Sequence, residues 1–184
     1  MKVAVTGHTS GIGKGIYDYF ANQPGYEVFG YSRSNGYELP YCHDSILAEI
    51  EKCDIFVNNS RPVESQIFLL KNLWPSWKDQ NKKIIVIGSI AAHLQFQAGP
   101  SGSNYQRLKK ELNDLCKELN YSTRFKNNCK VISFDPGWVD TPGFRRFNMG
   151  NSNPDDVMSV TQFVSMFDYV INAPIPVNEI SFRL

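Results

Sequence analysis

The sequence lacks several features that mark whole classes of protein. Its net charge is only +1, from 19 Lys and Arg against 18 Asp and Glu, so we expect no nucleic-acid partner and no membrane partner. No apolar run approaches the length of a membrane span. The four cysteines include no CxxC pair and no histidine at metal-ligand spacing, which favours free thiols over a disulfide framework or a zinc site. Because the first expected strand begins at residue 2, we expect no signal peptide. Together with the free thiols and the lack of a membrane span, this predicts a cytoplasmic protein, and the cysteine spacing predicts that it binds no metal.

The sequence does show short apolar runs that alternate with helical patterns. We expect strands at 2–6, 27–31, 54–58, 83–88, 130–135 and 177–182. We expect helices at 12–23, 45–52, 66–77, 103–121 and 154–172. This alternation predicts a parallel sheet covered on both faces. The chain 1–184 is therefore predicted to be one domain, a doubly wound Rossmann-type α/β fold with about six to seven mostly parallel strands.

The details of three segments are less regular. Residues 32–44, SRSNGYELPYCHD, are too few for the usual crossover helix between parallel strands, so a strand near 37–41 would be small. Asp44 is the expected N-cap of the helix that follows. We expect the helix at 66–77 to break around Pro75, and Pro154 to open the last helix.

A glycine cluster, TGHTSGIG at residues 6–13, lies between the first expected strand and the first expected helix. A glycine-rich turn at this place directs backbone N–H groups and the helix N-terminus at an anion, typically a dinucleotide pyrophosphate. A plain tight turn is the alternative. The candidate cofactor contacts are Gly7, His8, Thr9, Ser10, Gly11, Ile12 and Gly13.

Four further segments, in chain order, complete a family pattern: VNNS at 57–60, GS at 88–89, YQRLK at 105–109 and PGWVDT at 136–141. Together with the glycine cluster they resemble the TGxxxGxG, NNxG, catalytic serine, YxxxK and PGxxxT motifs of the short-chain dehydrogenase/reductase family. Arg61 stands where NNxG has its glycine. The resemblance implies an NAD(P)-dependent enzyme that interconverts a small-molecule carbonyl compound and an alcohol.

Three residues are the candidate catalytic set. Tyr105 would exchange a proton with the substrate oxygen, and Lys109, one helical turn along, favours the phenolate and would hold the nicotinamide ribose as in the family. Ser89 would hydrogen-bond the substrate oxygen. The family's catalytic asparagine has no clean counterpart, because Asn72 lies too far along its helix.

The end of the second strand indicates the cofactor. Arg33, flanked by Ser32 and Ser34, stands where NAD-binding chains carry an acidic residue, and a guanidinium there would pair with a 2′-phosphate. We therefore expect NADP(H), with NAD(H) as the alternative. Many NADP-preferring members of the family carry a basic residue at the position of Ser10. By resemblance, His8 would supply part of that basic residue's role. Glu38 and Leu39 would contact the adenine, with Asp44 as a rival.

The remaining expected contacts lie at other strand ends. The resemblance places Asn58, Asn59 and Ser60 beside the cofactor ribose, and Pro136, Gly137, Trp138, Val139 and Thr141 beside the nicotinamide carboxamide. We expect a shortened substrate lid at about 142–153. The candidate residues for the substrate pocket are His93, Phe96, Trp138 and Phe144.

Two other functions remain open from the sequence. The short lid would suit a dinucleotide-binding regulatory protein that lost efficient turnover, and a sugar-nucleotide epimerase or dehydratase would use the same tyrosine and lysine. By resemblance, we expect a homodimer or homotetramer that pairs through the helices at 66–77 and 103–121.

Overall fold

A computed structural model describes residues 1–94, 100–122, 129–148 and 153–183. Its centre is one parallel six-stranded sheet in the order β2-β1-β3-β4-β5-β6. The strands are β1 (Lys2–Thr6), β2 (Glu27–Tyr31), β3 (Ile55–Asn58), β4 (Lys83–Ile87), β5 (Lys130–Pro136) and β6 (Glu179–Phe182). The predicted doubly wound α/β fold is thereby confirmed, with six strands.

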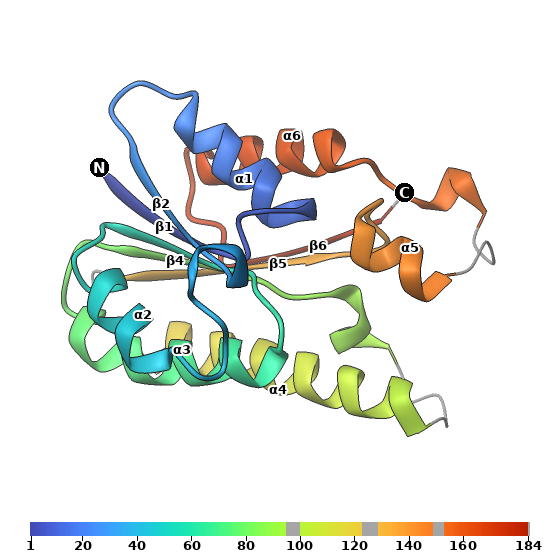
Figure 1. The fold of residues 1–184 in the computed structure, drawn as a ribbon, viewed down its shortest axis with the longest axis horizontal. Helices are drawn as coiled ribbons and strands as arrows, with labels where there is room; N and C mark the ends of the chain where they lie inside the picture. The colour runs from blue at the N-terminus through green and yellow to red at the C-terminus, as the bar shows by residue number, and fades with distance from the viewer. Residues whose placement is uncertain (95–99, 123–128, 149–152, 184) are drawn as a thin grey trace.

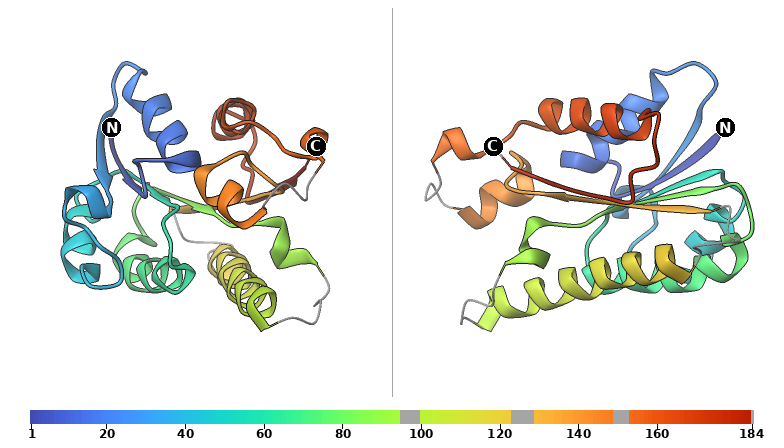
Figure 2. Two further views of the ribbon diagram at one scale, coloured as in Figure 1. Left: turned by 45° about the vertical axis from the view of Figure 1, so that its right-hand side comes forward. Right: turned by 180° about the vertical axis from the view of Figure 1, so that it is seen from behind.

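Helices cover both faces of the sheet, as Figures 1 and 2 show. One layer contains α1 (Gly11–Ala21) and α6 (Val160–Ile171), and the other contains α2 (His43–Ile50), α3 (Val63–Trp77) and α4 (Pro100–Ser122). Alternate side chains of the strands enter two separate apolar cores, so that Val3 and Val5 face the first layer while Ala4 faces the second. The short α5 (Pro142–Asn148) and the 3₁₀ turns η1 (Arg33–Asn35), η2 (Ile90–His93) and η3 (Pro154–Asp156) complete the fold.

The irregular segment 32–44 explains why the sheet has six strands. Residues 37–41, all of them described, form turns and no strand, so β2 is the edge of the sheet. The helix α2 begins at His43 with Cys42 as its N-cap, and Asp44 lies within its first turn. The expectation that Asp44 caps this helix is therefore wrong.

Two predicted helix limits also differ from the structure. Helix α3 continues through Pro75 although proline has no N–H to donate, because Leu73, Trp74 and Trp77 stay packed in the core. Pro154 opens only η3; α6 begins after Ser159, whose side chain forms a capping box with Gln162.

The structure also describes the cysteines and the lengths of the helices. All four cysteines lie within the described residues, and all four are free thiols. Among the described helices, none is both long enough and apolar enough to cross a membrane.

Candidate active site

The order of the strands reverses between β1 and β3, whose carboxyl ends carry the glycine loop and the asparagine pair. In open α/β sheets such a reversal leaves a crevice beyond the carboxyl ends of the strands, and ligands bind there. In Figure 1, α1 begins at this end of the sheet. The fold thus brings residues 6–13 and 58–60 to one place.

Glycine is required in this loop for two different reasons. Gly7 and Gly11 have φ angles of +70° and +56°, in the left-handed region that other residues avoid. A Cβ atom on Gly13 would overlap the carbonyl oxygen of Gly7 and the side-chain amide nitrogen of Asn59.

The loop then enters α1, whose N-cap Ser10 makes no side-chain capping bond and whose first turn has no acidic residue. Neither a capping side chain nor an acidic side chain of the first turn therefore competes with an anion for the first N–H groups of α1.

Thr6 joins this loop to the end of β3. Its Oγ1 accepts hydrogen bonds from the backbone N–H groups of Asn59 (3.1 Å) and Ser60 (3.3 Å), and Asn59 Nδ2 donates to the Thr6 carbonyl (3.2 Å). Asn58 is fully buried and donates through Nδ2 to the backbone carbonyl of Gln66 (2.8 Å). Asn59 therefore fixes the position of the loop on the end of β3, and Asn58 joins that strand end to α3.

The predicted cofactor-selecting residues lie in η1, at the end of β2. Asn35 holds this turn in place, because its Oδ1 accepts from Ser32 N (2.9 Å) and its Nδ2 donates to Gly30 O (2.7 Å). The Ser32 and Ser34 hydroxyls are 2.8 Å apart. Arg33 is exposed, and the structure gives its guanidinium no ion pair with any described residue. A cation therefore projects from a fixed turn.

His8 and Leu39 pack near this turn, while Glu38 does not. The His8 ring occupies the space where Gly30 lacks a side chain, and it lies 5.1 Å from the Tyr17 ring. Leu39 packs against the core beneath α2, and Glu38 is exposed. His8 thus extends the loop toward the end of β2.

Tyr105 and Lys109 lie one turn apart on α4, with the Lys109 Nζ 5.9 Å from the centroid of the Tyr105 ring. Lys109 is buried and donates to Gln66 Oε1 (2.9 Å) and to the carbonyl oxygen of Ile87 (2.9 Å). Gln66 Nε2 in turn donates to the Asn58 carbonyl oxygen (2.6 Å). Lys109 is thereby connected through one side chain to the strand end beside the glycine loop.

Burial lowers the pKa of Lys109 to about 7. The loss of hydration is the main cause, the negative charge of Asp135 opposes it, and the positive charge of Arg61 adds to it. Both direct hydrogen-bond acceptors of Lys109 are neutral. The ammonium group is therefore held in place without a contacting carboxylate.

Ser89 follows β4 and is the N-cap residue of η2. Its Oγ accepts a hydrogen bond from Ala91 N (3.2 Å), so the hydroxyl proton remains to be donated elsewhere. Ser89 and Tyr105 both belong to elements at the carboxyl end of β4, which are η2 and α4.

The segment after β5 crosses to the glycine loop. Gly137 N donates to Phe182 O (2.7 Å), and Val139 is buried and paired with Met158. Thr141 packs on Gly11, with its Cγ2 3.0 Å from where a Cβ of Gly11 would lie. Pro136 to Thr141 therefore reaches the same cleft as residues 6–13.

The predicted substrate residues are arranged in two groups. The half-exposed Trp138 and Phe144 lie beside each other, with ring centroids 6.0 Å apart. Phe96 lies outside the described residues. His93 contacts other groups, which are described below.

Neither family models nor curated protein sequences match this chain. Solved structures do. A short chain dehydrogenase from Burkholderia cenocepacia J2315, in complex with NADP, superposes with a TM-score of 0.77 at 17% identity, covering 98% of this chain and 87% of that one. A 3-alpha-hydroxysteroid dehydrogenase from Pseudomonas sp. B-0831, complexed with NADH, gives 0.74 at 17% identity, covering 99% and 94%. A serine dehydrogenase complexed with NADP+ gives 0.71 at 18% identity, covering 100% and 95%.

The chain has the short-chain dehydrogenase/reductase fold. In this fold four of the five matched segments follow the carboxyl ends of β1, β3, β4 and β5, and the fifth, residues 105–109, lies on α4.

The residues of the cleft fit a dinucleotide. The loop is built from glycines, since Gly7 and Gly11 have positive φ angles that strain other residues and a Cβ on Gly13 would overlap backbone, and it leads into a helix N-terminus without an acidic residue. His8 Nδ1 and Ser60 Oγ are both buried, and neither has a hydrogen-bond partner among the described residues. Such unpartnered groups beside a glycine loop suit the phosphates and ribose hydroxyls of a dinucleotide.

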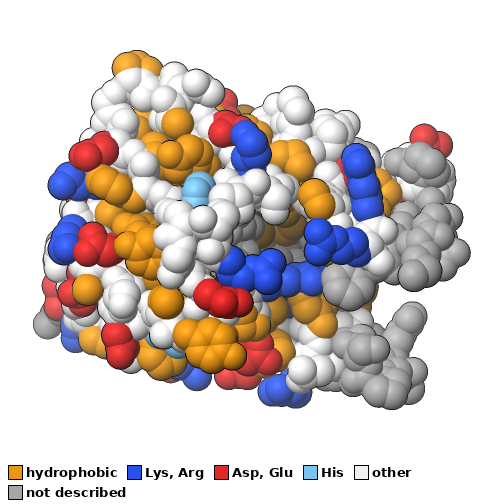
Figure 3. All heavy atoms as spheres, viewed as in Figure 1, with side chains coloured by type: hydrophobic (Ala, Val, Ile, Leu, Met, Phe, Trp, Pro, Cys, Tyr) orange, Lys and Arg blue, Asp and Glu red, His pale blue; other side chains and the backbone are white. Residues whose placement is uncertain are grey.

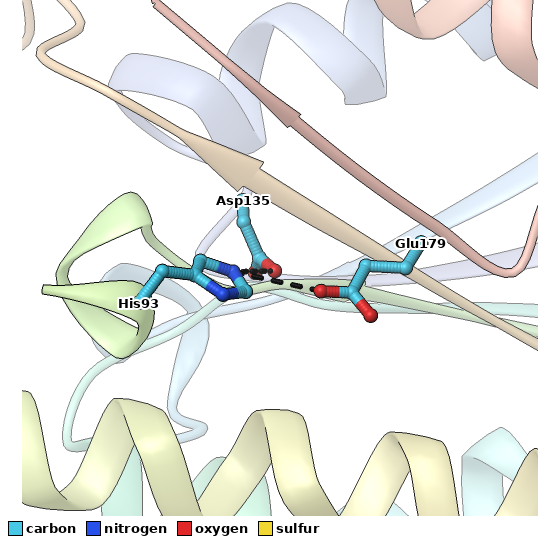
Figure 4. A group of neighbouring side chains, drawn as sticks. All are labelled: His93, Asp135 and Glu179. Carbon is cyan, nitrogen blue, oxygen red and sulfur yellow. Dashed lines mark hydrogen bonds and ion pairs between the residues drawn. The ribbon is translucent and has the colours of Figure 1, made fainter.

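His93, which we expect to line the substrate pocket, contacts two carboxylates (Figure 4). Its Nε2 lies 2.9 Å from Asp135 Oδ2, 3.6 Å from Glu179 Oε1 and 3.2 Å from Ser181 Oγ. Asn113 Nδ2 also donates to Asp135 (2.7 Å) and Glu179 (3.3 Å). These contacts connect η2, and with it Ser89, to β5 and β6.

The group of His93, Asp135 and Glu179 is also one that could hold a metal ion, since its donor atoms lie within 4.8 Å of one another. In the structure these atoms bond to each other, while Glu179 also pairs with Lys117 (3.3 Å) and Asp135 accepts from Ser133 (3.1 Å). The arrangement is a hydrogen-bonded network that supplies partners to a fully buried Asp135.

Sequence reasoning missed two functional features of the cleft. Gln66 was not recognised, although it falls on the apolar stripe of α3 with Leu70, Leu73 and Trp77, where a polar residue needs a buried partner. Asn72, the only asparagine considered in that helix, caps its own backbone by donating to Phe68 O (2.8 Å). The Asp135 network was the second, and its signal was an acidic residue inside an apolar strand.

Proposed function

We propose that this chain is an NADP(H)-dependent oxidoreductase of the short-chain dehydrogenase/reductase type, which interconverts a carbonyl compound and an alcohol. The observation that carries the proposal is the position of Lys109. Its Nζ lies 5.9 Å from the centroid of the Tyr105 ring. The same Nζ is linked through Gln66 to Asn58, which ends β3 beside the glycine loop. Lys109 is thus hydrogen-bonded, through Gln66, to the end of β3, where Asn59 and Ser60 bond to Thr6 at the start of the glycine loop.

In the proposed reaction, a bound reduced nicotinamide supplies the hydride. Tyr105 donates a proton to the substrate oxygen as that oxygen gains negative charge. Ser89 donates a hydrogen bond to the same oxygen, since its own oxygen already accepts from Ala91 N. In its protonated form, Lys109 places a positive charge beside the phenol while Gln66 and Ile87 fix its position.

The presence of all three of these residues favours turnover over a regulatory role. Gln66 supplies the hydrogen-bonded support for Lys109, so the pair does not depend on an asparagine at that place. A protein that only bound the dinucleotide would need none of this arrangement around a buried lysine, which is costly to desolvate.

NADP(H) is the cofactor that the end of β2 suits best. The Arg33 guanidinium projects from η1 beside the Ser32 and Ser34 hydroxyls, a set that matches a 2′-phosphate. Arg33→Ala should weaken NADPH binding by about 10-fold or more and leave NADH binding nearly unchanged. Titration followed by tryptophan fluorescence measures both, with Lys52→Ala, which removes an exposed cation between α2 and β3, as the matched control. Equal loss for both cofactors would contradict the 2′-phosphate contact.

Tyr105→Phe tests the chemistry. With NADPH and a panel of carbonyl compounds, this variant should lose about 100-fold or more of kcat, because it lacks the acid–base group. Its NADPH affinity should stay within about threefold of the native value, because the ring remains in place. Tyr121→Phe, which changes an exposed tyrosine of the same helix, is the control. Unchanged kcat in Tyr105→Phe would refute the proposed role.

The assembly and the compartment belong to the same proposal. We expect a homodimer or homotetramer formed through α3 and α4, whose outer faces carry ion pairs such as Lys71–Glu111 (3.7 Å) and Lys110–Asp114 (2.9 Å). Four free thiols suit a cytoplasmic protein. Light scattering coupled to size exclusion measures the assembly.

A further inference from the structure

Arg61 is the residue at which the chain departs from the NNxG motif, and its side chain lies beside the predicted proton donor. Its guanidinium carbon is 5.8 Å from the centroid of the Tyr105 ring, against 5.9 Å for the Lys109 Nζ. Arg61 is exposed, whereas Lys109 is buried. The buried Lys109 and the exposed Arg61 therefore both lie near the Tyr105 ring.

The charge at this place is not balanced by the groups that contact Lys109. Its two acceptors, the Gln66 amide and the Ile87 carbonyl, are neutral. Arg61 is close enough that its charge lowers the pKa of Lys109. Figure 3 shows several Lys and Arg side chains beside a hollow on the face of the molecule that is seen in Figure 1. An anion that enters this hollow is attracted to it.

The position of Arg61 favours the substrate over the dinucleotide as the source of that anion. The glycine loop packs on the residues before Arg61, because a Cβ on Gly7 would lie 3.0 Å from Asn59 Nδ2 and 3.3 Å from Ser60 Cα. Arg61 itself follows these residues and turns toward Tyr105. A group that reaches both the guanidinium and the tyrosine belongs to the molecule that receives the proton.

We propose that Arg61 binds a carboxylate of the substrate, so that the enzyme acts on short oxo acids and the corresponding hydroxy acids. The inference rests on the proposed function. A planar guanidinium pairs with a carboxylate through two parallel hydrogen bonds, which would orient the neighbouring carbonyl toward Tyr105 and Ser89. In the reduction, the carbonyl carbon gains a hydride from the reduced nicotinamide and the carbonyl oxygen gains a proton from Tyr105. An oxo acid thus leaves as a hydroxy acid, and NADPH leaves as NADP+.

Acid and ester pairs with the same carbonyl group test the proposal. The pairs are 2-oxobutanoate and its methyl ester, 3-oxobutanoate and its ethyl ester, and 4-oxopentanoate and its methyl ester. For at least one pair, the native enzyme should give a kcat/KM for the acid about 10-fold or more above that for the ester. Arg61→Met should remove this preference by lowering kcat/KM for the acid about 30-fold, with the ester within about threefold.

Two further variants separate charge from geometry. Arg61→Lys keeps the charge and loses the fork, so it should restore only part of the acid preference. Lys52→Met removes an exposed cation between α2 and β3 and should change nothing. A preference for every ester in the native enzyme, or an acid preference that persists in Arg61→Met, would overturn the proposal.

A binding measurement distinguishes this inference from the proposed reaction. NADP+-loaded protein cannot reduce an oxo acid, so calorimetry with the same acids reports binding alone. Native protein should bind at least one acid about 10-fold more tightly than Arg61→Met does, with equal NADP+ affinity in both. Acid binding without turnover would keep the Arg61 assignment and reject the reaction. Weakened NADP+ binding in Arg61→Met would give Arg61 to the cofactor and overturn the assignment.

Discussion

The two ends of the cleft are held together by different kinds of interaction. At the β1–β3 end, the structure relies on the absence of side chains, with Gly13 packed on Gly7 and Asn59, and on neutral hydrogen bonds to Thr6. At the β5–β6 end, it relies on charge, with the buried Asp135 bonded to His93, Asn113 and Ser133. The first end positions the dinucleotide-binding loop, and the second fixes η2 and therefore Ser89.

This difference has a physical consequence for each end. Close packing of glycines leaves no space for even one added carbon, but it does not depend on pH or salt. A buried carboxylate depends on every one of its donors, since losing one leaves a charge that water cannot reach. The glycine end should therefore be sensitive to volume and the carboxylate end to the removal of polar partners.

Gly13→Ala is expected to have the largest effect. Its Cβ would overlap backbone of Gly7 and the Asn59 amide, so the loop must move, at a cost of about 3 kcal/mol in the free energy of unfolding. NADPH binding should weaken by about 100-fold, because the displaced N–H groups no longer face the phosphates. Urea unfolding and fluorescence titration measure the two effects.

Gly143→Ala provides the matched control for that substitution. The nearest atom to a Cβ at this position, Thr141 Oγ1, lies 3.8 Å away, so the added methyl group fits without a shift. Native-like binding and stability are expected, within about 0.5 kcal/mol. If both alanine variants behaved alike, close packing would not be what defines the loop.

The same contrast explains what the sequence predicts well. Gly7, Gly11 and Gly13 stand out because each glycine answers a local constraint, and the run of residues 2–6 before them predicts β1 without error. The parallel sheet follows from the alternation of strands and helices. These features depend on residues close to one another in the sequence.

The other end depends on residues far apart, and the sequence could not bring them together. Asp135, His93 and Glu179 come from β5, η2 and β6, and only the register of β5 and β6 places the two carboxylates on one face. Gln66 escaped notice for a related reason, since its partner Lys109 lies 43 positions away. Periodicity shows that a polar residue lies on a buried stripe but does not name its partner.

Asp135→Asn tests the charged end, with an intermediate effect. The amide keeps the volume but loses the charge and one acceptor, which leaves at least one of the His93, Asn113 and Ser133 donors without a partner. We expect a loss of about 2 kcal/mol in the free energy of unfolding. Asp18→Asn, which removes the exposed partner of Lys14, should cost less than about 0.5 kcal/mol. Similar losses in both would mean that the Asp135 network contributes no more than a surface pair.

Lys109 joins the two ends, and its titration should give the smallest of the three effects. Because its pKa is about 7 in the folded protein and near 10.4 when unfolded, the unfolded chain binds more protons between these values. Stability must then rise with pH across that interval, by up to about 1.4 kcal/mol per unit. Subtracting the values for Lys109→Met, which cannot titrate there, removes the contribution of every other group. From pH 7.5 to 8.5, the free energy of unfolding of the native chain should increase by about 1 kcal/mol more than that of Lys109→Met, as measured by urea unfolding. A constant difference would mean that Lys109 keeps its proton in the fold, and the two ends would then be joined by a permanent ammonium ion.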